Sequence, residues 1–327
     1  MAQRQAWEGL GEAPDWIWAQ QKFPASAWLA QCVVRREGDR LWRVHLPSGQ
    51  REELTAPRVP DDSTTDIWQQ PTPQTRSEVD RLIPAITTAG LLEEGTLALA
   101  RNIVTEMGLQ YFVYGKLSAP FWTSYSLLGF DGLMTLPREN PALFDYMLER
   151  QLARALETAR AYAEIGVHGV FVEECLTSAD IISPAMYDRF VYPSDQILLR
   201  EFRRLGLPVI FYMTGDVIPR LERISELAPA ALVVEESKKG FRLDLAEVAA
   251  RLGERMAVFG NLDATQVKDW GDEEMSARIR EQVVAARPAR GFVTGIGSPF
   301  PLDTPRDRVT ALIRIARQVN GGVDDGE

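Results

Sequence analysis

The feature that most constrains the fold is an alternation of short apolar runs with amphipathic segments from residue 77 onward. A run of four or five apolar residues is typical of a parallel strand that is buried on both faces. The runs lie at 110–114, 169–173, 208–212, 231–235, 256–259 and 291–294. The helical segments lie at 141–165, 184–205, 216–227, 244–252, 273–286 and 305–319. This alternation predicts an α/β fold, and the number of repeats favours a (β/α)8 TIM-type barrel over an open sheet.

The chain before residue 77 has a different pattern. Two β-type runs, 32–36 and 41–46, flank a Gly38-Asp39 turn and predict a β-hairpin. Residues 55–77 are rich in Pro, Thr and Asp and are typical of an irregular connection. We therefore predict an N-terminal extension (1–76) packed on the barrel, a barrel (77–319) and a disordered tail (320–327).

Charge and composition exclude several classes of function. The formal net charge is -10, which disfavours nucleic acid as a partner because an acidic surface repels phosphates. No apolar run reaches the length of a membrane span and no signal peptide begins the chain, so we expect a cytoplasmic protein without membrane association. Only two cysteines and two histidines occur, which argues against a disulfide framework or a multi-histidine metal site.

Acidic residues follow several of the predicted strands. Active sites of parallel barrels lie at the carboxyl ends of the strands, so Glu173, Asp216, Glu235 and Asp263 are expected on one face. Carboxylates that are brought close together need a compensating positive charge. Three alternatives are open. One carboxyl group carries a proton, a divalent metal is held by Glu173, Asp216 and Glu235, or the acids pair with a cation, which is a substrate group, Lys238, Lys239 or an arginine.

Neighbouring residues of a strand point in opposite directions, so only one acid of each doublet enters the barrel. We predict that Glu173 and Glu235 do so. Asp216 and Asp263 are equally consistent with helix N-caps. The candidate catalytic residues are Glu173, Asp216, Glu235, Tyr212 and Asp131, and the candidate substrate-binding residues are Trp122, Glu174, Cys175, Glu236, Lys238, Asn261, Asp263 and Ser298.

Several short motifs occur once each along the chain, in an order that is typical of one protein superfamily. They are Ala-Pro-Phe-Trp-Thr at 119–123, Ile-Ser-Pro at 182–184, Tyr-Met-Thr-Gly-Asp at 212–216, Phe-Gly-Asn-Leu-Asp at 259–263, and Gly-Ser-Pro at 297–299 followed by Thr304-Pro305. In this order the chain resembles the uroporphyrinogen decarboxylase-like superfamily, which also contains cobamide-dependent methyltransferases. The resemblance implies a distorted TIM-type barrel, a cleft at the carboxyl ends of the strands, and a homodimer.

Differences from the motifs of that superfamily limit the substrates and reactions that we expect for this chain. An acid-lined cleft is electrostatically unsuited to a porphyrinogen that carries many carboxylates. The zinc-binding His-x-Cys pair of the thiol-activating methyltransferases is replaced by Tyr212 and Thr214, and Gly297-Ser298 lies near the third ligand position. None of these is a soft ligand, so activation of a thiol by zinc is excluded.

The resemblance and the acidic strand ends together predict an enzyme. We expect it to transfer a methyl group between a small cationic or methoxylated substrate and a corrinoid carried by a partner protein. Because the chain lacks an Asp-x-His-x-x-Gly pattern, we expect no tightly bound cofactor. A decarboxylase-type lyase that uses Asp131 and a non-catalytic binding barrel are the alternatives.

Overall fold

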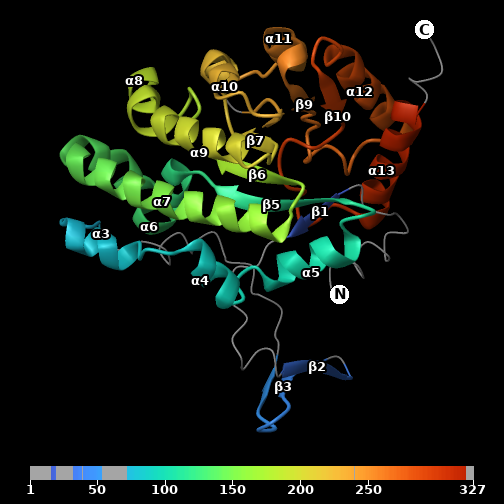
Figure 1. Cartoon of the computed structure of the whole chain (residues 1–327). Helices are drawn as coiled ribbons and strands as arrows, with labels where there is room; N and C mark the ends of the chain where they lie inside the picture. The colour runs from blue at the N-terminus through green and yellow to red at the C-terminus, as the bar shows by residue number, and fades with distance from the viewer. Residues whose placement is uncertain (1–15, 20–31, 39, 54–71, 239, 322–327) are drawn as a thin grey trace.

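The computed structural model describes residues 16–19, 32–38, 40–53, 72–238 and 240–321, and its centre is a sheet of seven parallel strands (Figure 1). In spatial order the strands are β1 (Trp16–Ala19), β5 (Phe112–Ser118), β6 (Gly169–Glu174), β7 (Val209–Met213), β8 (Ala231–Val234), β9 (Ala257–Phe259) and β10 (Gly291–Val293). The predicted strands match β5–β10 to within four residues at either end. The α/β class is thus confirmed. Within the described residues, β1 and β10 form the two edges of the sheet.

Helices alternate with the strands and cover the sheet. They are α3 (Arg76–Leu82), α4 (Thr88–Glu93), α5 (Ala98–Met107), α6 (Pro120–Glu139), α7 (Pro141–Ile165), α8 (Pro184–Met186), the π-helix η2 (Tyr187–Val191), α9 (Tyr192–Arg204), the 3₁₀ helix η3 (Ile218–Arg220), α10 (Leu221–Leu227), α11 (Leu245–Leu252), the 3₁₀ helix η4 (Gly253–Arg255), α12 (Asp272–Ala285) and α13 (Arg306–Gly321).

Helix α7 shows how local sequence sets these bounds. The side chain of Asn140 accepts a hydrogen bond from the Leu143 amide at 3.1 Å, and Pro141 occupies the first helical position. Proline is favoured there because its missing N–H has no partner in any case. Gly166 ends the helix with a φ of 78°, which other residues adopt only with strain.

The strand register sorts side chains onto two surfaces of the sheet. The outer surface faces the helices and holds Val113, Val172, Phe211, Leu232 and Val258. The inner surface carries a separate apolar cluster of Phe112, Phe171, Ile210, Tyr212, Ala231, Val233, Ala257 and Phe259. Glu173 pairs in register with Tyr212, and Tyr212 with Val233, so Glu173 lies on the inner surface.

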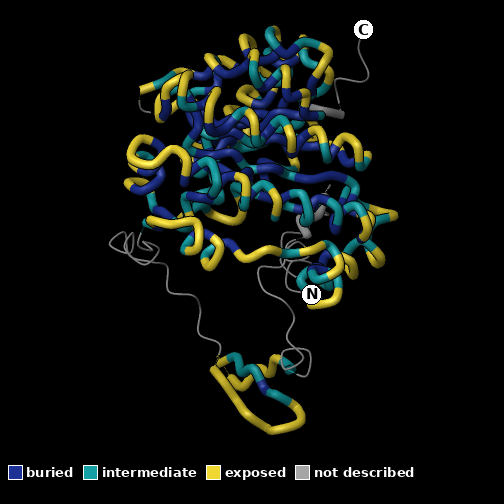
Figure 2. The backbone as a smooth tube through the Cα atoms, turned by 60° about the vertical axis from the view of Figure 1, so that its left-hand side comes forward, coloured by how far each residue is buried: buried dark blue, intermediate teal, exposed yellow. Residues whose placement is uncertain are grey.

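The N-terminal residues contribute to two sheets. The predicted hairpin is present as β2 (Cys32–Glu37) and β3 (Arg40–His45), and β4 (Arg51–Glu53) adds a third antiparallel strand. Figure 2 shows that buried residues gather around the parallel sheet, whereas this small sheet is mostly exposed or half-buried. Strand β1, which the sequence did not predict, pairs with β5. The boundaries of the three regions stay a prediction, and residues 322–327 of the tail lie outside the described part.

None of the helices in the described residues combines the length and the apolar character that crossing a membrane requires.

Candidate functional site

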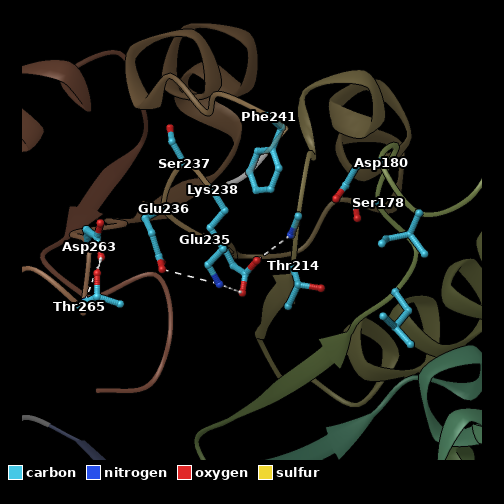
Figure 3. Close-up of a pocket in the computed structure, with 13 residues that line it drawn as sticks. Ser178, Asp180, Thr214, Glu235, Glu236, Ser237, Lys238, Phe241, Asp263 and Thr265 are labelled. Carbon is cyan, nitrogen blue, oxygen red and sulfur yellow. Dashed lines mark hydrogen bonds and ion pairs between the residues drawn. The ribbon is translucent and has the colours of Figure 1, made fainter. Parts of the chain in front are cut away.

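A pocket of about 500 Å³ lies beyond the carboxyl ends of β6, β7, β8 and β9 (Figure 3). Leu176, Ile181 and Phe241 are the large apolar residues of its lining. The charged residues of the described lining are Asp180, Glu235, Glu236, Lys238 and Asp263. The lining therefore holds four carboxyl groups and one ammonium group, and its charge is strongly negative.

Glu235 makes contacts through both of its carboxylate oxygens. One carboxylate oxygen, Oε2, accepts a hydrogen bond from the Gly215 amide at 2.9 Å. The other, Oε1, lies 2.9 Å from Lys238 Nζ and 3.4 Å from the Tyr212 hydroxyl. Only 12% of the Glu235 side chain is exposed. Contacts to Tyr212 of β7, to the loop after β7 and to Lys238 hold this carboxylate in one orientation.

Gly215 is required at its position by two independent constraints. Its φ of 78° lies in the left-handed region, and a Cβ there would lie 2.2 Å from Ser178 Oγ. The glycine thus lets the loop after β7 approach the loop after β6 and turn its amide toward Glu235. Beside it, the Asp216 amide donates to Asp180 Oδ1 at 2.8 Å, which ties the same two loops together.

Glu236 is even more deeply buried, with 5% of its side chain exposed. Its Oε1 accepts a hydrogen bond from Ser298 Oγ at 2.6 Å and lies 3.6 Å from Lys238 Nζ. Its Oε2 is buried and has no hydrogen-bond partner in the described residues. A Cβ at Gly297 would lie 2.2 Å from both the Glu236 nitrogen and Oε2, so only glycine allows this loop to pack here.

Lys238 bridges the two glutamates. Burial by itself lowers the pKa of the Lys238 ammonium, but the hydrogen bonds and charges of Glu235 and Glu236 outweigh burial and raise it. Lys238 is therefore positively charged at neutral pH. One cation faces two carboxylates, which leaves this group of three with a negative charge.

Tyr212, on the inner surface of the sheet, extends toward the group formed by Glu235, Glu236 and Lys238. Its hydroxyl can donate to the Gly297 carbonyl at 3.2 Å or to Glu235. Burial, and then chiefly the negative charge of Glu235, raise the pKa of Tyr212. The phenol is thus neutral and acts as a hydrogen-bond donor.

The structure separates the three carboxylates that we considered as a metal site. Glu173 forms an ion pair with Lys116 of β5, and the Asp216 carboxylate accepts a hydrogen bond from the Ile218 amide at 3.2 Å. Asp216 thus stabilises the turn before η3 through an amide two residues later, but the N-cap residue of η3 is Val217, so the alternative role of Asp216 as a helix N-cap is not confirmed. In the described part of the chain, no three His, Cys, Asp or Glu side chains gather closely enough to hold a metal ion.

Glu174 points away from the pocket, because it follows Glu173 and faces the outer surface. It is completely buried beside Asp195 of α9, which is also completely buried. Burial, and then the charge and hydrogen bond of Asp195, raise the pKa of Glu174 well above its usual range. Burial likewise raises the pKa of Asp195 to about 8. The prediction that Glu174 binds substrate is not supported by this position.

Cys175 is buried and does not line the pocket. Burial, and then the charges of Glu174 and Glu173, raise the pKa of its thiol to about 12. The side chain is therefore a neutral thiol rather than a thiolate nucleophile.

The remaining predicted residues divide into those near the pocket and those away from it. Asn261 donates to the Glu235 carbonyl at 3.1 Å, and Asp263 lines the pocket while accepting hydrogen bonds from Thr265 and Gln266. Trp122 stacks on Tyr125 in α6, with ring centroids 4.9 Å apart. Asp131 is exposed on α6. Neither Trp122 nor Asp131 belongs to the pocket lining.

Sequence reasoning missed Ser178 and Asp180, which line the pocket. We considered only the three residues after Val172, whereas these two side chains lie farther along the loop. The polar run Thr177-Ser178-Ala179-Asp180 was the available signal. Ser178 Oγ is buried and has no hydrogen-bond partner in the described residues.

Comparison with known proteins identifies the family. The family model of uroporphyrinogen decarboxylase (URO-D) matches residues 63–319. A uroporphyrinogen decarboxylase from Nostoc sp. is 28% identical over 257 residues, which cover 76% of this chain and 69% of the relative. One from Anaeromyxobacter dehalogenans is 25% identical over 244 residues, which cover 73% and 67%.

Among solved structures, a methyltransferase from Methanosarcina mazei superposes with a TM-score of 0.65 at 17% identity. The superposition covers 97% of this chain and 83% of that protein, and it supports the fold. Together with the match of the family model over most of the chain, these likenesses confirm the resemblance inferred from the motifs at 119–123, 212–216 and 259–263. The chain belongs to the uroporphyrinogen decarboxylase family.

Proposed function

We propose that the protein is an enzyme that transfers a methyl group from a small quaternary ammonium substrate to a corrinoid carried by a partner protein. The observation that carries the proposal is the charge of the pocket. Four carboxyl groups and one lysine line the described pocket, and Glu235 and Glu236 are its most buried acids. A positively charged substrate group relieves their repulsion, whereas an anionic one increases it.

The other side chains suit the same kind of substrate. Phe241 contributes an aromatic ring to the lining, and aromatic faces attract alkylammonium groups. Leu176 and Ile181 offer apolar surface to N-methyl groups. A pocket with apolar walls and few, well-positioned polar groups is typical of a site for a small molecule.

The proposed reaction balances without a proton. The bond between a methyl carbon and the ammonium nitrogen breaks, both electrons stay on nitrogen, and a neutral amine leaves. A reduced corrinoid, when bound, supplies the electron pair that accepts the methyl group. The carboxylates of Glu235 and Glu236 bind and orient the cation, and Tyr212 and Ser298 hold those carboxylates in place.

Methyl transfer is further supported by the solved methyltransferase from Methanosarcina mazei, whose fold this chain shares. Ile181 lines the pocket and is exposed, 38% of its surface being accessible. An exposed apolar side chain at the pocket suits contact with a flat macrocycle held by another protein. No residue of this chain is proposed as a ligand of its metal.

Choline and its uncharged analogue 3,3-dimethylbutan-1-ol test the proposal, because they share a shape and differ in charge. In calorimetry we expect choline to bind more tightly than the analogue, and propionate not to bind. Glu235→Gln should weaken choline binding by at least about tenfold, or about 1.4 kcal/mol. The matched control Glu247→Gln removes an exposed carboxylate of α11 and should have no effect.

Turnover is tested with choline, reduced cobalamin and the protein, and dimethylaminoethanol is the expected product. Preferential binding of propionate, or choline binding that Glu235→Gln leaves unchanged, contradicts the proposed substrate class. Binding of choline without any product in the presence of reduced cobalamin would instead favour a non-catalytic binding barrel.

Decarboxylation is a second candidate, because the curated relatives are uroporphyrinogen decarboxylases. It requires cationic groups for the substrate carboxylates. Within the described residues, Lys238 is the only cation that lines the pocket, and Glu235 and Glu236 already neutralise it. Release of carbon dioxide from uroporphyrinogen by the purified protein would favour this candidate over methyl transfer.

A further inference from the structure

We infer that Lys238 is an internal counter-ion that occupies the place of the substrate's cationic group and is displaced when substrate binds. This inference rests on the proposed function, since it assumes a cationic substrate. It assigns to Lys238 a role in selectivity: only a ligand that carries its own positive charge can replace it between the two glutamates.

The depths of the three side chains support this assignment. Glu235 and Glu236 keep 12% and 5% of their side chains exposed, whereas Lys238 keeps 41%. The carboxylates thus form the floor, and the lysine reaches them from the solvent side. Its ammonium lies 2.9 Å from one carboxylate and 3.6 Å from the other, the arrangement expected of a cation that both glutamates share.

The backbone around Lys238 forms a tight turn with a fixed base. Lys238 and Phe241 form an antiparallel bridge, in which the Phe241 amide donates to the Lys238 carbonyl at 3.3 Å. At the base, Ser237 Oγ accepts from the Leu243 amide at 2.9 Å and donates to the Leu243 carbonyl at 3.2 Å. This base at Ser237 separates Lys238 from Glu235 and Glu236, which directly follow β8.

Gly240 gives this turn room to change. Its φ of 88° is in the left-handed region, and no atom lies within 4 Å of the position of a Cβ. Phe241, on the same turn, also lines the pocket (Figure 3). Withdrawal of Lys238 would thus leave two carboxylates without an ammonium partner in a pocket whose lining includes an aromatic ring, which is a suitable environment for an alkylammonium group.

The charge balance explains why an uncharged ligand fails. With Lys238 in place, the two carboxylates and the ammonium sum to -1. If a neutral ligand expelled Lys238, two buried carboxylates would face each other without a cation, which is strongly unfavourable. A ligand with one positive charge restores the net charge of -1, so the exchange of Lys238 for this ligand costs little electrostatic free energy.

Lys238→Met tests the inference, because methionine keeps most of the side-chain length without the charge. We expect choline to bind this variant at least about tenfold more tightly than it binds the unmodified protein, since no internal cation competes. The matched control Lys268→Met breaks the exposed Lys268–Asp303 pair, which is 2.7 Å long, and gives the same net charge. It should bind choline as the unmodified protein does.

A second measurement uses the unmodified protein and does not depend on the variant folding. Amine-reactive labelling followed by mass spectrometry should show Lys238 reacting faster when choline saturates the protein, while Lys268 reacts at an unchanged rate. The analogue 3,3-dimethylbutan-1-ol should not change the labelling of Lys238.

The outcomes separate this inference from the proposed function. Choline binding by the unmodified protein that is unchanged or weaker in Lys238→Met overturns the displacement of Lys238 and leaves the proposed substrate class intact. Unchanged labelling of Lys238 at saturating choline does the same. Failure of choline to bind either protein rejects the proposed substrate class, and the inference fails with it.

Discussion

Replacement of Asp195 by asparagine should make the protein more stable at pH 8 and reduce the dependence of its stability on pH. Asp195 and Glu174 are both completely buried, and their carboxyl groups share a hydrogen bond, which requires a proton on one of them. Burial raises the pKa of Asp195 from 3.8 to about 8. The folded protein therefore keeps a proton on Asp195 that the unfolded chain has already released.

The sign and size of the effect follow from this difference. As the pH rises from about 4 to about 8, the unfolded chain gains stability by ionising Asp195 and the folded protein does not. Each pH unit in that range lowers the free energy of unfolding by about 1.4 kcal/mol, so the full range lowers it by on the order of 5 kcal/mol. The stabilisation from protonated Asp195 is complete below pH 4, is lost progressively between pH 4 and pH 8, and does not change further above pH 8.

Asparagine mimics the protonated acid and does not titrate, so Asp195→Asn should remove this cost. Glu174 remains buried in the variant, so the slope of stability against pH is expected to decrease rather than vanish. Urea denaturation at pH 5, 6, 7 and 8 measures that slope, and Asp145→Asn, which removes an exposed acid paired with Arg189, is the control. A slope in Asp195→Asn equal to that of the unmodified protein and of the control would show that the reasoning about the buried pair is wrong.

Three further predictions concern the pocket and its surroundings. Gly297→Ala should lower choline affinity and stability together, because its Cβ would lie 2.2 Å from Glu236 Oε2; calorimetry and urea denaturation check this, and unchanged values would contradict the packing. Cys175 in a Cys32→Ser variant should resist Ellman's reagent at pH 8 until urea is added, because burial raises the pKa of its thiol to about 12; rapid reaction of the native protein would contradict the burial. Treatment with EDTA should leave choline binding unchanged, because the described residues bring no three metal-ligating side chains together; loss of binding that Mg²⁺ or Zn²⁺ restores would indicate a metal site.

The positions of the secondary-structure elements could be predicted from the sequence because they depend on local composition. The run predicted at 231–235 matches β8 (Ala231–Val234) except for its last residue, since a strand covered on both faces has to be apolar along its whole length. Asn140, Pro141 and Gly166 set the bounds of α7 through neighbouring backbone groups only. β1 was missed because its four residues lie in a stretch of mixed polarity, and only pairing with β5 makes them a strand.

The sequence also indicated which acid of the first doublet faces inward. The register places Glu173 on the inner surface and Glu174 on the opposite one. Alternation along a strand is a local property, so this part of the site followed from residue spacing. For the second doublet the prediction was wrong, because Glu235 and Glu236 follow the end of β8 and both line the pocket. The motif order in turn predicted the family, which the family model confirms over residues 63–319.

The partners of these acids were decided only by the tertiary structure. Glu173 meets Lys116 from β5, and Glu174 meets Asp195 from α9. Lys238 was recognised in the sequence as one of several cations, but its position between two glutamates depends on the turn that it begins. The physical reason is that local composition determines where helices and strands form, whereas the electrostatic energy of a charged side chain depends on its burial and on its distance from other charges in the folded protein.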